Sequence, residues 1–135
     1  MVKKRVYVAF DYDDLDVKQN LVAQSTLPDC PFELIDSSID RAMPEKWERE
    51  ARKRISACEC VIVLCGEQTH QAKGVAKELQ MAQELGKPYF LLAGTRRSSP
   101  TRPQNARTTD KIWTWRWATV ATLLEGKVPP PDAAL

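Results

Sequence analysis

The sequence lacks long hydrophobic runs and carries no excess of charge of either sign. Its longest apolar stretches, such as Val61–Cys65, are far too short to cross a bilayer. Lys and Arg together number 20 and Asp and Glu 18, so the formal net charge is only +2. A chain so close to neutrality has no long-range attraction to nucleic acid or to anionic membranes. We therefore expect neither nucleic acid nor a membrane among its partners.

Signals for export and for metal binding are also absent. The apolar run near the N-terminus stops at Asp11 and does not form a secretory signal, so we expect a cytoplasmic protein with reduced thiols. His70 is the single histidine, whereas a structural zinc site needs about four Cys or His ligands. The four cysteines are Cys30, Cys58, Cys60 and Cys65, with one close pair among them. We therefore predict no metal and interpret the cysteines as small buried apolar residues.

The glycine motifs that mark several enzyme classes are missing as well. Neither G-x-G-x-x-G nor G-x-x-x-x-G-K-[ST] occurs, so the usual dinucleotide and P-loop phosphate sites are not expected. The absence of G-x-S-x-G argues against an α/β-hydrolase.

What the sequence contains is an alternation of strand-like and helix-like segments. Residues 60–65 form a short run that is apolar on both faces, as is typical of a central parallel strand. The pattern predicts strands over 5–10, 32–35, 60–65, 89–93 and 112–115, and helices over about 14–24, 44–58, 71–85 and 117–124. The alternative for 112–115 is that it forms one continuous helix with the residues that follow, and we favour the strand. This alternation predicts an α/β fold with about five parallel strands and helices on both faces of the sheet.

Two segments stand apart from this pattern. Residues 94–110 contain almost nothing apolar, which predicts a loop long enough to be functional or mobile. Its arginines are either phosphate contacts or solvated charges: Arg96, Arg97, Arg102 and Arg107. Residues 128–135 include three consecutive prolines, so we expect a disordered tail after a single domain over residues 1–127.

One carboxylate falls on the apolar face of the third helix. With Val75 at zero on a wheel of about 100° per residue, the apolar stripe centres at about 330° and Glu78 at about 300°. Glu84 falls at about 180°, on the solvent side. An ionised carboxylate among apolar groups costs several kcal/mol unless it has a partner. Glu78 therefore either lies at the rim or pairs with a cation such as Arg54, or is held beside a ligand.

Three loops are expected to meet at the carboxyl edge of the sheet, where α/β proteins bind ligands. They contain the candidate substrate contacts Asp11, Tyr12, Asp36, Ser38, Thr69 and His70. Asp11 and Asp36 end strands where carboxylates often meet a sugar hydroxyl, and they are equally suited to cap a helix. Tyr12 and Trp47 are suited to stack on a base, although Trp47 is also suited to anchor the core face of its helix.

Together these residues resemble the TIR-like domains of Thoeris anti-phage defence. The resemblance lies in Arg-Val-Tyr-Val-Ala-Phe-Asp-Tyr at the start, Asp-Ser-Ser-Ile after the second strand and Trp47-Glu48 at the next helix. Its strongest part is Cys-Val-Ile-Val-Leu-Cys-Gly-Glu-Gln-Thr-His, followed by Gly-Val-Ala-Lys-Glu-Leu and Leu-Gly-Lys-Pro. The ordered set, over residues 4–93, carries the resemblance rather than any single motif.

The resemblance implies a flavodoxin-like three-layer sandwich and an NAD nucleosidase or ADP-ribosyl cyclase. Such an enzyme cleaves the nicotinamide–ribose bond of NAD, which is its substrate and not a cofactor, and makes a signalling nucleotide. The family's catalytic glutamate would be Glu78, with Phe10 and Asp11 contacting the nucleotide and Trp47 near the base or ribose. Expected partners are a small nucleotide substrate, further copies of the chain through TIR–TIR contacts, and a downstream effector that senses the product.

One departure from the family leaves two alternatives open. TIR enzymes usually carry a tryptophan four residues before the glutamate, where this chain has Gly74. Gly-Val-Ala-Lys-Glu is similar instead to the G-x-x-x-E motif of nucleoside 2-deoxyribosyltransferases, whose glutamate attacks the same kind of N-glycosidic bond. The third interpretation is a non-catalytic TIR assembly module, because fold alone does not fix function.

Overall fold

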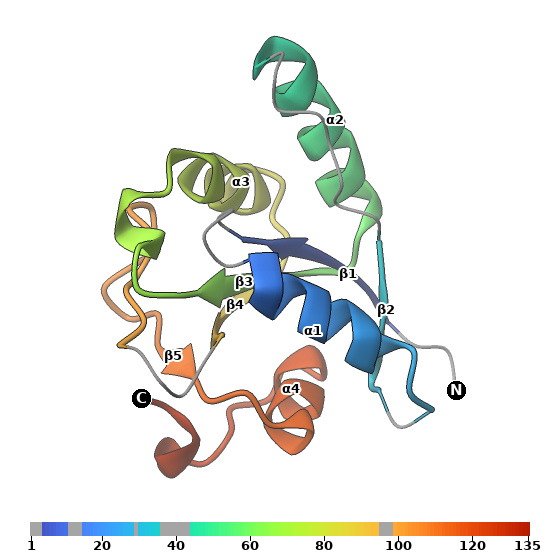
Figure 1. Cartoon of the computed structure of the whole chain (residues 1–135), viewed down its shortest axis with the longest axis vertical. Helices are drawn as coiled ribbons and strands as arrows, with labels where there is room; N and C mark the ends of the chain where they lie inside the picture. Colours follow the sequence, from blue (N-terminus) through green and yellow to red (C-terminus); the bar gives the residue numbers. More distant parts are fainter. Residues whose placement is uncertain (1–3, 11–14, 29, 36–43, 95–98) are drawn as a thin grey trace.

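A single five-stranded parallel sheet organises the computed structural model, which describes residues 4–10, 15–28, 30–35, 44–94 and 99–135 (Figure 1). The strand order is β2-β1-β3-β4-β5, and every neighbouring pair is parallel. The strands are β1 (Lys4–Ala9), β2 (Phe32–Leu34), β3 (Cys60–Cys65), β4 (Tyr89–Ala93) and β5 (Ile112–Trp113). The helices are α1 (Leu15–Ser25), α2 (Pro44–Ala57), α3 (Lys73–Glu84) and α4 (Trp117–Leu124). Short 3-10 turns lie at η2 (Thr69–Gln71) and η3 (Pro131–Ala133).

The helices cover the two faces of the sheet in pairs. Alternate residues of β1 point to opposite faces, so Tyr7 packs with α2 and α3, whereas Val6 packs with α1 and α4. β3, at the centre of the sheet, is buried along its whole length, as its continuous apolar run predicts. The predicted flavodoxin-like α/β sandwich with a five-stranded parallel sheet is confirmed.

Helix α2, which packs in the same cluster as Tyr7, has the predicted helical periodicity. Trp47, Ala51 and Ile55 are all buried, and Cys58 continues the same face just beyond the helix. All four cysteines are buried free thiols in the core, as predicted. Burial raises the pKa of the Cys58 thiol above its ordinary value, which keeps it protonated near neutral pH.

Glycine ends two helices through left-handed backbone. Gly86, after α3, has φ +67°, and Gly126, after α4, has φ +78°. An L side chain rarely adopts this conformation, so both positions favour glycine. Gly86 therefore ends α3, next to the predicted helix end at residue 85. Among the residues that the structure describes, no helix combines the length and apolarity needed to cross a membrane.

The C-terminal segment differs from the predicted disordered tail. Pro131–Ala133 form a 3-10 turn, and Ala134 pairs with Trp113 in an antiparallel bridge. The N–H of Thr114 donates to the carbonyl of Ala133 at 2.8 Å, and the N–H of Leu135 donates to that of Ile112 at 2.8 Å. The prolines therefore shape a turn that brings the following residues against the edge strand β5. This pairing also explains why regular parallel pairing in β5 stops at Trp113, two residues before the predicted end.

Candidate functional site

Glu78 is buried on the inner face of α3. Its side chain is 1% exposed, and one of its carboxylate oxygens, Oε2, accepts a hydrogen bond from the Tyr7 hydroxyl. Glu84, two turns further along the helix, is 46% exposed and forms an ion pair with Arg52 on the surface. The helical wheel predicted this contrast between an inward Glu78 and an outward Glu84, and the structure confirms it.

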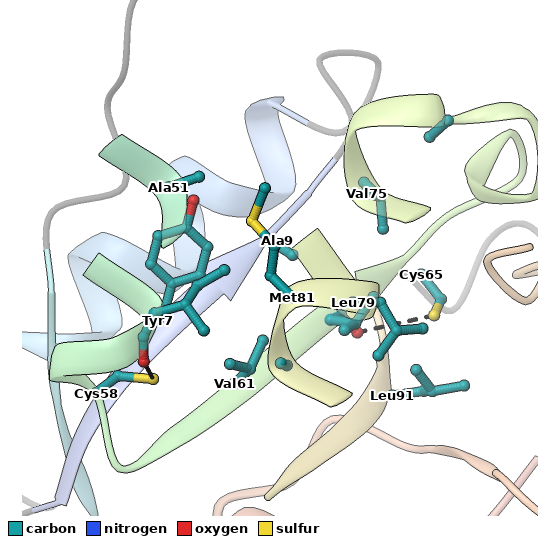
Figure 2. Packing of buried hydrophobic residues seen from close by; sticks show 14 of the residues in the cluster. Tyr7, Ala9, Ala51, Cys58, Val61, Cys65, Val75, Leu79, Met81 and Leu91 are labelled. Carbon is teal, nitrogen blue, oxygen red and sulfur yellow. Dashed lines mark hydrogen bonds between the residues drawn. The ribbon is translucent and has the colours of Figure 1, made fainter. Parts of the chain in front are cut away.

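Tyr7 is the partner that sequence reasoning missed. It lies in the middle of β1, is 1% exposed, and belongs to the cluster that packs beneath α2 and α3. Figure 2 shows its ring rising from the strand with the hydroxyl near Ala51 of α2. A buried tyrosine hydroxyl usually finds a hydrogen-bond partner. The alternation of β1 combined with the inward angle of Glu78 was therefore a signal that could have paired the two residues.

The described residues of the cluster around the Tyr7–Glu78 pair are largely apolar. Val75, Leu79 and Ala82 of α3 are fully buried in the same cluster, together with Ala51 of α2. A carboxylate in such surroundings is costly to ionise without hydrogen bonds to its oxygens. The Tyr7 hydroxyl supplies one of these hydrogen bonds and fixes the direction of the carboxylate.

Ion pairs join α2 to α3 on the outer side of this cluster. Lys77 pairs with Glu48, and Arg52 pairs with Glu84 at 2.8 Å. Arg54, the cation considered as a partner for Glu78, lies 3.9 Å from Glu50, one turn earlier in its own helix. The two interhelical pairs are largely exposed, so each contributes about 0–1 kcal/mol to stability.

Two of the three aromatic residues assigned to the substrate, Phe10 and Trp47, lie on different faces of the sheet. Trp47 is 5% exposed and shares the cluster of Tyr7, on the same side as Glu78. Phe10 is 6% exposed in the opposite cluster, with the Lys18 ammonium 5.3 Å from its ring centroid. The structure thus brings Trp47 into the cluster around Glu78 and places the ring of Phe10 in the other one.

Thr69 and His70 lie in the turn between β3 and α3. The Thr69 hydroxyl is buried and accepts a hydrogen bond from the N–H of Gly66 at 2.8 Å. His70 is exposed, and its Nδ1 lies 2.9 Å from the hydroxyl of Thr101. The Thr69 side chain therefore holds the backbone of Gly66, and the His70 side chain contacts the segment that contains Thr101. The remaining predicted contacts, Asp11, Tyr12, Asp36 and Ser38, lie outside the residues that the structure describes.

The residues around Glu78 suit chemistry at a sugar carbon better than metal chemistry. No cluster of three or more His, Cys, Asp or Glu side chains able to hold a metal occurs in the described part of the chain. A carboxylate oriented by a phenol in an apolar setting can stabilise positive charge that develops on a nearby ribosyl carbon. Electrostatic stabilisation of this kind is strong because water is largely excluded.

Two solved structures are among those similar to this chain. The structure of the CMP N-glycosidase BcmB from Clostridium botulinum is 21% identical, with a TM-score of 0.46, covering 67% of this chain and 69% of that chain. A prokaryotic SEFIR domain is 12% identical, with a TM-score of 0.54, and the match covers 92% of this chain and 89% of that one. The second similarity shows a shared architecture over nearly the whole chain. No curated protein sequence matches.

A sequence model of one family matches most of the chain. The model describes the TIR-like domain of the Thoeris protein ThsB, and it matches residues 7–96. The matched region begins at Tyr7 and includes β3 and α3, so both members of the buried hydrogen bond fall within it. This chain therefore belongs to the family of TIR-like domains of the Thoeris protein ThsB.

Proposed function

We propose that this TIR-like domain cleaves the N-glycosidic bond between nicotinamide and ribose in NAD. In this reaction the bond electrons pass to the pyridinium nitrogen, so nicotinamide leaves as a neutral molecule. Because the leaving group starts as a cation, it needs no general acid. The ribosyl carbon develops positive charge and is then captured by water, with loss of a proton, or by another atom of the same molecule. Hydrolysis gives ADP-ribose, and internal capture gives a cyclic product.

Glu78 is the catalytic residue in this proposal, and Tyr7 is its positioning residue. The observation that carries the proposal is a buried glutamate on α3, hydrogen-bonded by a phenol, within a chain of the ThsB family. The carboxylate stabilises the ribosyl cation or bonds to it. In this proposal Trp47, which is buried in the same cluster, meets the base or ribose.

Catalysis requires a conformation in which the substrate reaches the carboxylate. Glu78 is 1% exposed, so the side chains that cover it must move when NAD binds. Two exposed ion pairs join α2 to α3, Lys77–Glu48 and Arg52–Glu84. Because they are exposed, breaking them when the helices separate costs little free energy. The proposed function includes this opening. It also includes self-association of the domain and an effector that senses the product.

The burial of the Glu78 carboxylate also supports a second candidate function, a non-catalytic assembly module. In that case the Tyr7–Glu78 hydrogen bond serves only to join β1 to α3. The two candidates differ in whether nicotinamide is released. A base-exchange enzyme acting on deoxynucleosides is distinguished by its substrate, since it uses the same glutamate on a different N-glycosidic bond.

The test is incubation of the purified protein with NAD, followed by chromatography of nicotinamide. Glu78→Gln should lower nicotinamide release by about 100-fold or more, because the amide carries no charge to stabilise the ribosyl cation. Glu84→Gln is the matched control on the same helix and should retain activity, because its side chain faces solvent. Turnover undiminished in Glu78→Gln contradicts the mechanism. Release of bases from deoxynucleosides, with NAD left intact, supports the base-exchange alternative instead.

A further inference from the structure

The structure contains a hollow that Glu78 does not line. It is a groove of about 1350 Å³ at the end of β4 and β5, bordered by α1, the start of α4 and the segment 99–111. Ligand pockets commonly measure about 300–1,000 Å³, so the groove has room for a nucleotide-sized molecule. Its walls come from Asn20 and Gln24 on α1 and from Arg116 and Trp117 at α4.

Cationic side chains predominate among the charged residues of this groove. Arg102, Lys111 and Arg116 line it, against the single acidic side chain of Asp110. Asp110 Oδ2 already accepts hydrogen bonds from the Tyr89 hydroxyl at 2.6 Å and from the N–H of Arg107 at 2.8 Å. Among the described residues, no acidic side chain forms an ion pair with Lys111 or Arg116. The groove therefore has positive charge available for an anion.

The start of α4 adds further donors at the same place. Arg116 is the N-cap residue of this helix, and no side chain caps the first turn. The first intrahelical hydrogen bond runs from the N–H of Val120 to the carbonyl of Arg116, at 2.9 Å. The preceding N–H groups of the first turn, beginning at Trp117, are thus left to other acceptors. A phosphate group is suited to this position because helix N-termini attract anions.

Indole rings lie beside these donors. Trp115 and Trp117 both line the groove, with their ring centroids 6.3 Å apart in an edge-to-face arrangement. Trp117 also packs edge-on against Phe32, with centroids 5.6 Å apart, so its ring is held in place. Rigid indoles next to cations suit a ligand that joins an aromatic base to phosphate.

We propose that this groove is a second ligand site that binds a nucleoside phosphate. The phosphate lies against Arg116, Lys111 and the first turn of α4, and the base lies against Trp115 or Trp117. Glu78 takes no part, because it is buried on α3 and does not line the groove, although Ala93 and Ile112 at the edge of the sheet border both the groove and the cluster around Glu78. The site is therefore independent of the proposed N-glycosidic chemistry.

Titration calorimetry of the full chain with ADP, adenosine and inorganic pyrophosphate tests this site. ADP should bind at least about ten-fold more tightly than adenosine or pyrophosphate, because only ADP offers both base and phosphate. Arg116→Ala should weaken ADP binding about ten-fold through loss of a charge-assisted contact. Its side chain is exposed, so the variant is expected to fold. Lys127→Ala, an exposed cation just beyond the far end of α4, should change the affinity less than about two-fold.

Several results would overturn the proposal. They are no heat of binding with ADP, an affinity for ADP that Arg116→Ala leaves unchanged, and pyrophosphate binding as tight as that of ADP. Glu78→Gln separates the two sites. Unchanged ADP affinity in this variant supports a separate groove, whereas loss of ADP binding places the nucleotide at Glu78 and contradicts the second site. Nicotinamide release is a different measurement, so failure of one proposal is distinguishable from failure of the other.

Discussion

Tyr7 and Glu78 connect β1 to α3 through one buried hydrogen bond. Tyr7→Phe removes the donor while keeping the ring, so the fold should persist with a weaker link. A hydrogen bond to a charged group contributes about 1.5–3 kcal/mol, and we expect the free energy of unfolding to fall by about this amount. Urea denaturation of the wild type and variant measures the change.

A double-mutant cycle tests whether this loss belongs to the hydrogen bond. In a Glu78→Gln background the acceptor is an uncharged amide, so Tyr7→Phe should cost less than about 1.5 kcal/mol there. An equal cost in both backgrounds would mean that the Tyr7 hydroxyl acts independently of Glu78.

Cys60 should make the protein less stable at alkaline pH. Burial, followed by the nearby charge of Cys58, raises the pKa of its thiol from 9.0 to about 12. Above pH 9 the unfolded chain loses this proton while the folded chain retains it. Stability from this group is therefore complete below pH 9 and is lost as the pH rises toward 12, by up to about 1.4 kcal/mol per pH unit.

Urea denaturation at several pH values between 8 and about 11 measures this effect. Cys60→Ala should show a shallower decline above pH 9 than the wild type, because it lacks the titrating thiol. Identical slopes for the two proteins would show that ionisation of Cys60 does not contribute.

For single residues, the sequence predicted which way a side chain points but not which residue it contacts. The inward angle of Glu78 followed from helical periodicity, because the spacing of Val75, Leu79 and Ala82 defines the buried face. Its hydrogen bond to Tyr7 joins residues 71 positions apart. Such a contact depends on strand order and register, which local periodicity does not specify.

At the scale of elements, residues 99–110 show how a polar segment is fixed without regular structure. The Thr101 hydroxyl accepts a hydrogen bond from the N–H of His70 at 2.9 Å, and the Thr101 N–H donates to the carbonyl of Gly66 at 2.9 Å. Further along, the Asn105 side chain donates to the carbonyl of Ala76 in α3 at 2.6 Å. The segment therefore follows the β3–α3 turn and the side of α3.

Thr101→Val should loosen this segment without changing its shape. The variant leaves the N–H of His70 without the hydroxyl acceptor, so we expect a loss of about 1–2 kcal/mol of stability. Amide hydrogen exchange in residues 99–110 should also become faster. Thr108→Val, at an exposed position in the same segment, is the control and should change neither quantity. Unchanged exchange in Thr101→Val would show that other contacts hold the segment.

The elements themselves were largely predictable, and their exceptions have physical causes. The bounds of β3, β4 and α4 match the predicted ranges because each is a continuous apolar run or a strongly periodic one. α3 begins at Lys73 rather than at 71, because the preceding residues form the 3-10 turn Thr69–Gln71. Composition alone does not separate such a turn from the helix that follows it.

At the scale of the whole molecule, the sequence did not predict how other segments pack against the β5 edge of the sheet. Alternating strands and helices predicted the layers and the parallel sheet, but not the groove near β5 or the folding back of the C-terminal residues. Both depend on how segments distant in the sequence pack against the β4–β5 edge. An exposed edge strand promotes pairing with other chains, so a segment that covers the edge hinders such pairing.

Deletion of residues 128–135 should therefore destabilise the domain and promote its aggregation. It removes the backbone hydrogen bonds of Thr114 and Leu135 and uncovers the edge formed by Ile112–Trp113. We expect a loss of about 2 kcal/mol, from two hydrogen bonds of about 1 kcal/mol each, measured by urea denaturation. Light scattering should show larger particles for the deletion variant. Asp132→Ala, at an exposed position of the same turn, should behave as the wild type. A deletion variant with wild-type stability and size would mean that the edge strand needs no cover.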